Sequence, residues 1–226
     1  MKIIDAVYRD NSSQRTPCVI VVDGSTSMEE GNAIFHLNEA LQAFERALKE
    51  DDEASVRVQV KMIRMGGHDE ATALGDWTDA IDFRAPHVEA NGSTPMGKAI
   101  DMAMGEIQAQ KEVYKRNGIP YTRPWLFVFS DGSPTDEDVW RDVAARCRQA
   151  QEDKRFVLFA VAVGANARVD ALRAFCGPDR PVLSSDSLKF KEMFLWLAAS
   201  LAATSRSQPG QQVALPSPAN WLTVAT

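Results

Sequence analysis

The chain has 226 residues, of which 45% are hydrophobic and 25% are charged, and its 25 basic and 31 acidic side chains leave a formal net charge of -6 at pH 7. This composition excludes a disordered, fibrous or disulfide-stapled protein, and no Lys/Arg-rich run is present that would follow a nucleic-acid backbone. The first residues lack the apolar stretch of a secretory signal, and no run approaches the roughly 18 apolar residues of a membrane span. We therefore expect a cytoplasmic protein with neither a nucleic-acid nor a membrane partner.

The predicted elements alternate between strands and helices along the chain. Continuous apolar runs indicate strands buried on both faces, and a 3.6-residue period indicates helices with one buried side. In chain order the sequence predicts a strand at 18–22, a helix at 34–48, strands at 55–63 and 70–77, a helix at 96–107, a strand at 125–129, a helix at 139–150, a strand at 156–163, and helices at 169–175 and 190–201. This alternation predicts an α/β, Rossmann-like doubly wound fold, with a mostly parallel six-stranded sheet, one antiparallel edge strand and helices on both faces.

The predicted strand at 55–63 differs from the others because its polar and apolar residues alternate. Arg57, Gln59 and Lys61 are the polar members, as in a strand with one solvated face near a sheet edge. A Gly-Gly turn follows, and the strand at 70–77 is too close in sequence for a crossover helix. We expect this hairpin to finish one edge of the sheet.

The length suits one domain and a tail, because two full domains would each fall below the usual size. We expect the domain to span residues 1–204 and the tail residues 205–226. The tail is rich in Gln, Pro and Ser, as a linker is. It nevertheless ends with Trp221, Leu222 and Val224, which are too apolar for a segment with nothing to bury, so we expect them to dock on the domain.

Oxygen-bearing side chains follow the first predicted strand at every second residue, as Asp23, Ser25 and Ser27. In extended backbone these three side chains face one way. A carboxylate with two hydroxyls is a sensible partial shell for a hard divalent cation such as Mg²⁺. The alternative interpretation is a strand-to-helix turn in which Asp23 or a serine caps the next helix.

Two further segments favour the metal interpretation. Asp131 follows the fourth predicted strand, which neighbours the first in the 3-2-1-4-5-6 order, so Asp23 and Asp131 should face each other. Thr94 precedes Pro95 at the start of a predicted helix, of which Pro95 would be the first residue. The alternative interpretation of Thr94 is an ordinary N-cap of that helix, which needs no metal. Because order, spacing and strand context agree, we interpret Asp23, Ser25, Ser27, Thr94 and Asp131 together as a metal site.

This constellation resembles the metal-ion-dependent adhesion site (MIDAS) of von Willebrand factor A domains, over about residues 15 to 204. The resemblance implies that Ser25, Ser27 and Thr94 ligate Mg²⁺, or Mn²⁺ or Ca²⁺, directly, and that Asp23 and Asp131 act directly or through water. It also implies a protein-binding module rather than an enzyme. Three of the five oxygens would be neutral hydroxyls, so we expect the protein partner to contribute an acidic side chain to the metal.

A narrower resemblance is to the TerY-like bacterial proteins associated with tellurite resistance. It is carried by residues 23–28, 37–41, 93–97 and 130–136. It implies a cytoplasmic protein linked to a kinase and a phosphatase, either of which is a candidate partner. One departure is Thr26, because many relatives have glycine between the two serines and threonine is poorly suited to a positive φ.

Two other functions remain open at this point. A haloacid-dehalogenase-like phosphohydrolase would use Asp23 as its nucleophile, but it needs a second Asp where this chain has Ser25. A metal-free scaffold of the same fold would bind partners through other surfaces. Histidines show no ligand or triad spacing, and the three cysteines, Cys18, Cys147 and Cys176, have no CxxC pairing, so we expect these cysteines to be buried packing residues.

Overall fold

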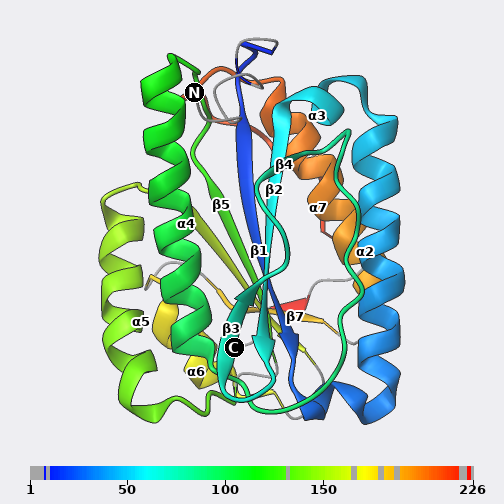
Figure 1. Ribbon diagram of the computed structural model, residues 1–226, viewed down its shortest axis with the longest axis vertical. Helices are drawn as coiled ribbons and strands as arrows, with labels where there is room; N and C mark the ends of the chain where they lie inside the picture. The colour runs from blue at the N-terminus through cyan, green and yellow to red at the C-terminus, as the bar shows by residue number, and fades with distance from the viewer. Residues whose placement is uncertain are drawn as a thin grey trace.

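A single twisted sheet with helices on both faces forms the fold, as the computed structural model shows (Figure 1). The structure describes residues 8, 11–130, 133–163, 167–177, 181–185, 189–218 and 223–224. The parallel strands, in spatial order, are β2 (Val58–Gly66), β1 (Thr16–Gly24), β5 (Trp125–Ser130), β6 (Val157–Val163) and β7 (Leu183–Ser185). The antiparallel strands are β3 (Glu70–Ala73) and β4 (Thr78–Asp79), which pair with β2, and β8 (Thr223–Val224), which pairs with β7.

The predicted α/β doubly wound fold is confirmed. Its six strands correspond to the order β3-β2-β1-β5-β6-β7, with β3 as the antiparallel edge strand, and the sequence analysis had located all of these except β7. The two-residue strands β4 and β8 add short pairings beyond the six that were predicted. The neighbouring positions of β1 and β5 matter most for function, because they place two strand ends side by side.

The helices form one layer on each face of the sheet (Figure 1). One layer contains α2 (Ala33–Glu50) and α7 (Phe190–Ser205), and the other contains α4 (Met96–Asn117), α5 (Glu137–Glu152) and α6 (Val169–Phe175). Two short helices lie in connections, the 3-10 helix η1 (Thr26–Asn32) and α3 (Asp52–Arg57). The predicted helices are all present among these elements.

Both faces of the central strands are buried, which explains their continuous apolar sequences. Along β1, Cys18, Ile20 and Val22 pack beneath α2 and α7, whereas Val19 and Val21 pack beneath α4 and α5. This two-residue alternation is the ordinary geometry of a strand. All three cysteines are free and buried, and burial raises the pKa of the Cys147 thiol to about 12.

The expectation of a strand at 55–63 with one solvated face is wrong in two respects. The carboxylate of Asp51 accepts a hydrogen bond from the Ala54 N–H at 2.9 Å and begins α3, so the strand starts only at Val58. Gln59 and Lys61 are also buried, with exposed fractions of 2% and 5%. Helix α4 covers that face and supplies polar partners to both side chains.

Those partners form a buried network around Gln59. Its Oε1 accepts hydrogen bonds from Tyr8 Oη at 3.3 Å, Gln110 Nε2 at 3.0 Å and Tyr114 Oη at 2.5 Å. Lys61 Nζ lies 3.6 Å from Glu106 Oε2. Polar residues can therefore occupy the interior here because each has a hydrogen-bonding or charged partner.

Beyond α7 the tail contacts the domain at several points. Trp196 Nε1 donates a hydrogen bond to the carbonyl of Pro216 at 2.8 Å, and Gln14 Nε2 donates one to the carbonyl of Ser207 at 2.7 Å. The backbone of Val224 pairs with β7. Trp221 and Leu222, which the sequence analysis expects to dock, lie outside the described residues. Within the described part of the chain, no helix combines the length and apolarity that a membrane crossing requires.

Candidate metal centre

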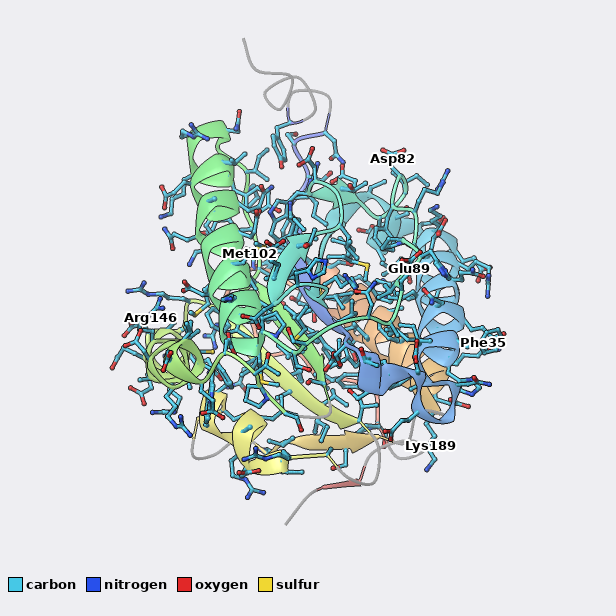
Figure 2. The ribbon with its side chains drawn as sticks, turned by 60° about the horizontal axis from the view of Figure 1, so that its bottom comes forward. Phe35, Asp82, Glu89, Met102, Arg146 and Lys189 are labelled. Carbon is cyan, nitrogen blue, oxygen red and sulfur yellow. The ribbon has the colours of Figure 1, made fainter. Side chains whose placement is uncertain are left out.

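The described candidate metal residues, Asp23, Ser25, Ser27 and Thr94, lie around the edge where β1 and β5 end side by side. Both strands are parallel, so their carboxyl ends reach the same edge of the sheet. From this edge β1 continues through η1 to α2 on one face, whereas α4 and α5 cover the other face. Ligands of doubly wound proteins bind in the crevice at such a switch point. Figure 2 shows this edge turned toward the viewer.

The first loop is ordered by hydrogen bonds among the predicted ligands themselves. Asp23 is 1% exposed, and its Oδ1 accepts a hydrogen bond from the Ser25 N–H at 2.9 Å. The hydroxyls of Ser25 and Ser27 lie 2.9 Å apart, with Ser25 buried and Ser27 exposed. The structure therefore brings these three predicted residues together, but not through extended backbone as expected, because the 3-10 helix η1 begins at Thr26 and contains Ser27.

Ser130, the last residue of β5, joins the two strands at this edge. Its hydroxyl donates a hydrogen bond of 2.6 Å to Asp23 Oδ2. The β1–β5 register pairs Val22 with Phe129, so its continuation places Asp23 opposite Ser130. Ser130 was not among the residues predicted from the sequence, although this register could have identified it. Asp131 comes next in the chain and lies outside the described residues.

The second loop crosses the ends of β1 and β2 and carries Thr94. The Gly92 carbonyl accepts hydrogen bonds from Thr26 N at 3.0 Å and Thr26 Oγ1 at 3.2 Å, and the Asn91 N–H donates one to the Gly24 carbonyl at 2.8 Å. Thr94 bonds in turn to Thr135, because its N–H donates to Thr135 Oγ1 at 3.2 Å and its carbonyl accepts from Thr135 N at 3.0 Å. Three segments far apart in sequence thus meet at one edge.

Thr94 does not serve as the N-cap that the alternative interpretation expects. Pro95 occupies the N-cap of α4 and the helix begins at Met96. The Lys98 N–H donates instead to Asp136 Oδ2 at 2.8 Å, so a carboxylate from the start of α5 satisfies this helix end. The Thr94 hydroxyl has no hydrogen-bond partner within the described part of the chain, although the residue is buried.

Two charged groups that the sequence analysis did not assign support the second loop. The guanidinium of Arg64 donates to the Gly24 carbonyl at 3.0 Å, the Glu89 carbonyl at 3.1 Å and Asn91 Oδ1 at 2.6 Å. Asp69 accepts hydrogen bonds from Lys98, Thr135 and Ser93, and the Lys98 contact is the main cause that holds the Asp69 pKa below its usual value. Arg64 carried no sequence signal, because it lies within a strand.

Thr26, which stands where many relatives have glycine, introduces no backbone strain. The described non-glycine residues with positive φ are Asn32, Asp69 and Lys154, and Thr26 is not among them. Its hydroxyl instead bonds to Gly92, as described above. Gly24, which precedes Ser25, leaves little room for a side chain, because a Cβ there would lie 2.4 Å from Arg64 Nε and would force the Arg64 side chain to move.

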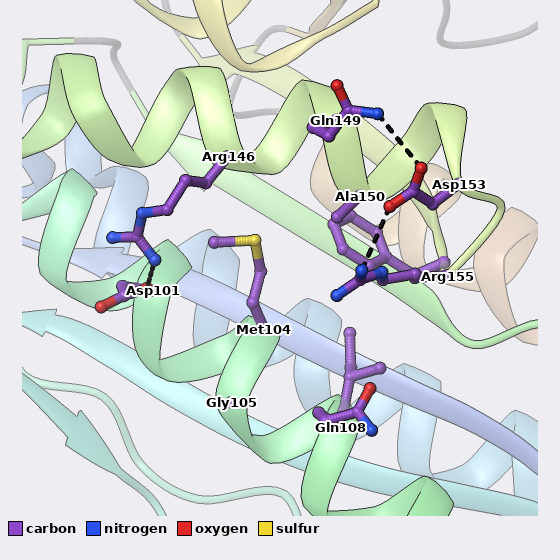
Figure 3. Close-up of a pocket in the computed structure, with 11 residues that line it drawn as sticks. Asp101, Met104, Gly105, Gln108, Arg146, Gln149, Ala150, Asp153 and Arg155 are labelled. Carbon is purple, nitrogen blue, oxygen red and sulfur yellow. Dashed lines mark hydrogen bonds and ion pairs between the residues drawn. The ribbon is translucent and has the colours of Figure 1, made fainter.

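A groove between α4 and α5 is the main alternative cavity, but its charges are already paired (Figure 3). Arg146 lies 2.6 Å from Asp101, and Arg155 lies 3.1 Å from Asp153. The described residues also contain no cluster of three or more His, Cys, Asp or Glu side chains suited to a metal. The strongest candidate site is therefore the hydroxyl-rich edge that holds Asp23.

Comparison with known proteins agrees with this geometry. The family model described as the von Willebrand factor type A domain matches residues 18–194, which include most of β1 with its loop and all of β5. The chain belongs to the von Willebrand factor type A domain family. The comparison with curated proteins gives no match.

Solved structures share the von Willebrand factor type A (VWA) fold at low sequence identity. The pilus adhesin SpaC from Lactobacillus rhamnosus GG superposes with a TM-score of 0.66 and 12% identity over 84% of this chain and 30% of that chain. The ArnB paralog VWA2 from Sulfolobus acidocaldarius superposes with a TM-score of 0.53 and 15% identity, over 83% of this chain and 45% of that chain. Manganese-loaded TRAP from Plasmodium vivax superposes with a TM-score of 0.51 and 16% identity, over 80% of this chain and 74% of that chain. The chain thus spans under a third of SpaC and under half of VWA2.

Proposed function

We propose that this VWA domain binds a divalent cation at the Asp23 edge and uses it to bind a protein partner. The ligands would be Asp23, Ser25, Ser27, Thr94 and Asp131, with Mg²⁺ or Mn²⁺ as the first candidates and Ca²⁺ as a third. The observation that carries the proposal is that hydrogen bonds at one end of the sheet join the segments 23–27 and 91–94 to each other and to Ser130 and Thr135.

The residues at this edge fit such a cation chemically. Carboxylate and hydroxyl oxygens are hard ligands, which suit Mg²⁺ and Mn²⁺. The backbone N–H of Ser25 and the hydroxyl of Ser130 already orient the Asp23 carboxylate. Contacts of this kind, made by groups behind the ligands, typically tune metal affinity. When bound, the cation supplies a positive charge that an acidic side chain of a partner can ligate.

The relatives support the proposal by analogy. TRAP was crystallised with manganese, and SpaC is a pilus adhesin. We propose that the partner contributes an acidic residue, because the hydroxyls of Ser25, Ser27 and Thr94 are neutral and leave the cation electrophilic. The net charge of -6 would otherwise disfavour an acidic partner, so its binding should depend on the metal. A kinase or phosphatase of a bacterial tellurite-resistance or stress-response system, in the cytoplasm, is the partner we would test first.

A metal-dependent binding site explains the residues at the Asp23 edge better than a catalytic site does. A phosphohydrolase that used Asp23 would need a general acid where Ser25 stands, and a serine hydroxyl cannot protonate a leaving group at neutral pH. The Ser25 hydroxyl contacts the Ser27 hydroxyl rather than a general base. A phosphatase assay on the purified chain tests this alternative directly, and turnover that disappears in Asp23→Asn would favour the enzyme.

Calorimetric titration of Mg²⁺ and Mn²⁺ into the wild type, Thr94→Ala and Thr204→Ala tests the metal site. Thr204 is a matched control, because it is also buried but lies in α7. We expect Thr94→Ala to weaken binding at least tenfold, about 1.4 kcal/mol, and Thr204→Ala to bind like the wild type. A wild type that binds neither ion would leave the metal-free scaffold as the better account. A partner that stays bound equally well in excess EDTA would show that the metal does not mediate recognition.

A further inference from the structure

A groove beside the metal edge separates the start of α2 from the segment 84–92. It encloses about 470 Å³ and is lined by Glu29, Ile34, Phe35, Asn38, Glu39, Gln42, His87, Val88, Glu89 and Ala90. Figure 1 shows this segment running alongside α2 toward the metal edge, and Figure 2 labels Phe35 on α2 and Glu89 on the segment. The family resemblance and the proposed metal site do not account for this groove.

Hydrogen bonds fix the two walls of the groove relative to each other. Asn38 of α2 donates from Nδ2 to the Val88 carbonyl at 2.9 Å and accepts at Oδ1 from the Val88 N–H at 2.8 Å. Farther along the helix, Glu45 Oε2 accepts from the Ala85 N–H at 2.8 Å. The groove is therefore preformed, so a ligand would not have to order it on binding.

The groove combines an exposed aromatic ring with buried apolar residues. Phe35 is 56% exposed, more than any other exposed large hydrophobic side chain in the described chain. Ile34 and Ala90 are half-buried beside it and Val88 is buried. An aromatic side chain on the rim of an apolar depression is typical of a protein-binding site.

The charge of the groove specifies the partner further. Glu29, Glu39 and Glu89 line it, and none of the described lining residues is Lys or Arg. Glu39 lies 3.9 Å from His36, whereas the salt bridges of the described residues include neither Glu29 nor Glu89. Unpaired carboxylates around an apolar depression favour a basic residue next to an apolar one.

The groove is also connected to the metal loop. Glu29 belongs to η1, which directly follows Ser25. On the other wall, Arg64 donates to both the Glu89 carbonyl and the Gly24 carbonyl. One protein segment could therefore reach both places at once.

We propose that this groove is a second recognition site, which binds an apolar side chain adjacent to a Lys or Arg in a protein partner. That the same partner also gives a carboxylate to the metal rests on the proposed function. Binding in the groove itself does not require the metal, so the two proposals can fail separately.

The test is an NMR titration of the full ¹⁵N-labelled chain with two capped dipeptide amides, phenylalanyl-lysine and phenylalanyl-glutamate, first in EDTA and then in Mg²⁺. We expect saturable shifts of the amides of residues 29, 34–42 and 87–90 with the lysine peptide, and at least tenfold weaker binding of the glutamate peptide. Glu89→Lys should weaken binding of the lysine peptide at least tenfold. Glu50→Lys should leave this binding unchanged, because Glu50 lies at the far end of α2.

Equal binding of both dipeptides, or no saturable shift in the groove, would overturn the inference. An equal loss of affinity for the lysine peptide in Glu89→Lys and Glu50→Lys would also overturn the inference, because the effect would then come from net charge alone. Failure of the proposed metal site would appear differently, as residues 23–27 that do not respond to Mg²⁺ while the groove still binds the lysine peptide.

Discussion

The hydroxyl of Ser130 and the carboxylate of Asp23 form a buried hydrogen bond of 2.6 Å between two neighbouring parallel strands. Because this contact orients a predicted metal ligand, Ser130→Ala should lower Mn²⁺ affinity by about 10-fold or more without unfolding the domain. Calorimetric titration measures the change. Ser200→Ala is the control, since Ser200 is equally buried and its hydroxyl has no partner in the described structure. Equal affinities of wild type and Ser130→Ala would show that Ser130 does not support the site.

Gly92 passes so close to Gly67 that a side chain cannot fit between them. A Cβ at Gly92 would lie 1.7 Å from the Gly67 carbonyl oxygen, and the residue has φ of +75°. Gly31 also has positive φ, at +57°, but a Cβ there would meet nothing within 4 Å. We expect Gly92→Ala to reduce the free energy of unfolding by at least about 1 kcal/mol more than Gly31→Ala does. Urea denaturation compares the two, and equal losses would contradict the predicted clash.

Arg15 and Asp79 form an ion pair inside the protein, with 3.5 Å between Arg15 Nε and Asp79 Oδ1. Arg15 is fully buried, so Asp79→Asn would leave its charge without a counter-ion, but it would also remove the cost of burying the Asp79 carboxylate. In an Arg15→Met background the same change should cost at least about 1 kcal/mol less. A double-mutant cycle by urea denaturation measures this difference. Additive effects would show that the two residues are not coupled.

The same pair predicts a pH dependence of stability. Burial raises the pKa of Asp79 above its ordinary value of 3.8, and the opposing attraction of Arg15 does not cancel that effect. The folded state therefore holds this proton more tightly than the unfolded state. The stability that the protonated Asp79 contributes is fully present below pH 3.8, and it is lost as the pH rises through the higher pKa of Asp79 in the folded protein. Denaturation of wild type and Asp79→Asn across this window should show the wild type losing stability relative to the variant. A constant difference would contradict the raised pKa.

Removal of the tail after Ser205 should destabilise the domain. The truncation deletes the Pro216 carbonyl that accepts a hydrogen bond from Trp196, and it exposes the indole, which is otherwise mostly buried. We expect a loss of at least about 1 kcal/mol, or a melting temperature lower by about 2–4 °C. A shorter truncation after Pro218 is the control, because it retains this contact and should lose less. Unchanged melting of the longer truncation would show that the tail does not dock.

Local sequence patterns were sufficient to predict the fold and to place Asp23 at the end of the first strand. The apolar run that ends at Val22 depends on the geometry of a single strand, and Asp23, Ser25 and Ser27 follow it across the end of β1 and the start of η1. The 3-2-1-4-5-6 order of doubly wound sheets then made the first and fourth predicted strands neighbours, and it correctly placed β1 next to β5. The arrangement of Ser25 and Ser27 needed no knowledge of distant residues.

Features that depend on distant partners were not predictable in this way. The polar residues of β2 indicated a solvated face, because nothing near Gln59 in sequence reveals that Tyr114 lies against it. The role of Arg64 depends likewise on carbonyl groups 25 and 40 positions away. Strand β7 has only three residues, too few for a periodic signal.

The contacts that join the loops of the candidate site have consequences for the folding pathway. The Asp23–Ser130 hydrogen bond closes 107 positions of chain, and the Thr26–Gly92 hydrogen bond closes 66. Closing such long loops costs entropy that only the finished sheet repays, so this edge assembles late. A cation bound there would contribute little to the rate of folding. It would instead slow unfolding and lengthen the lifetime of the native state.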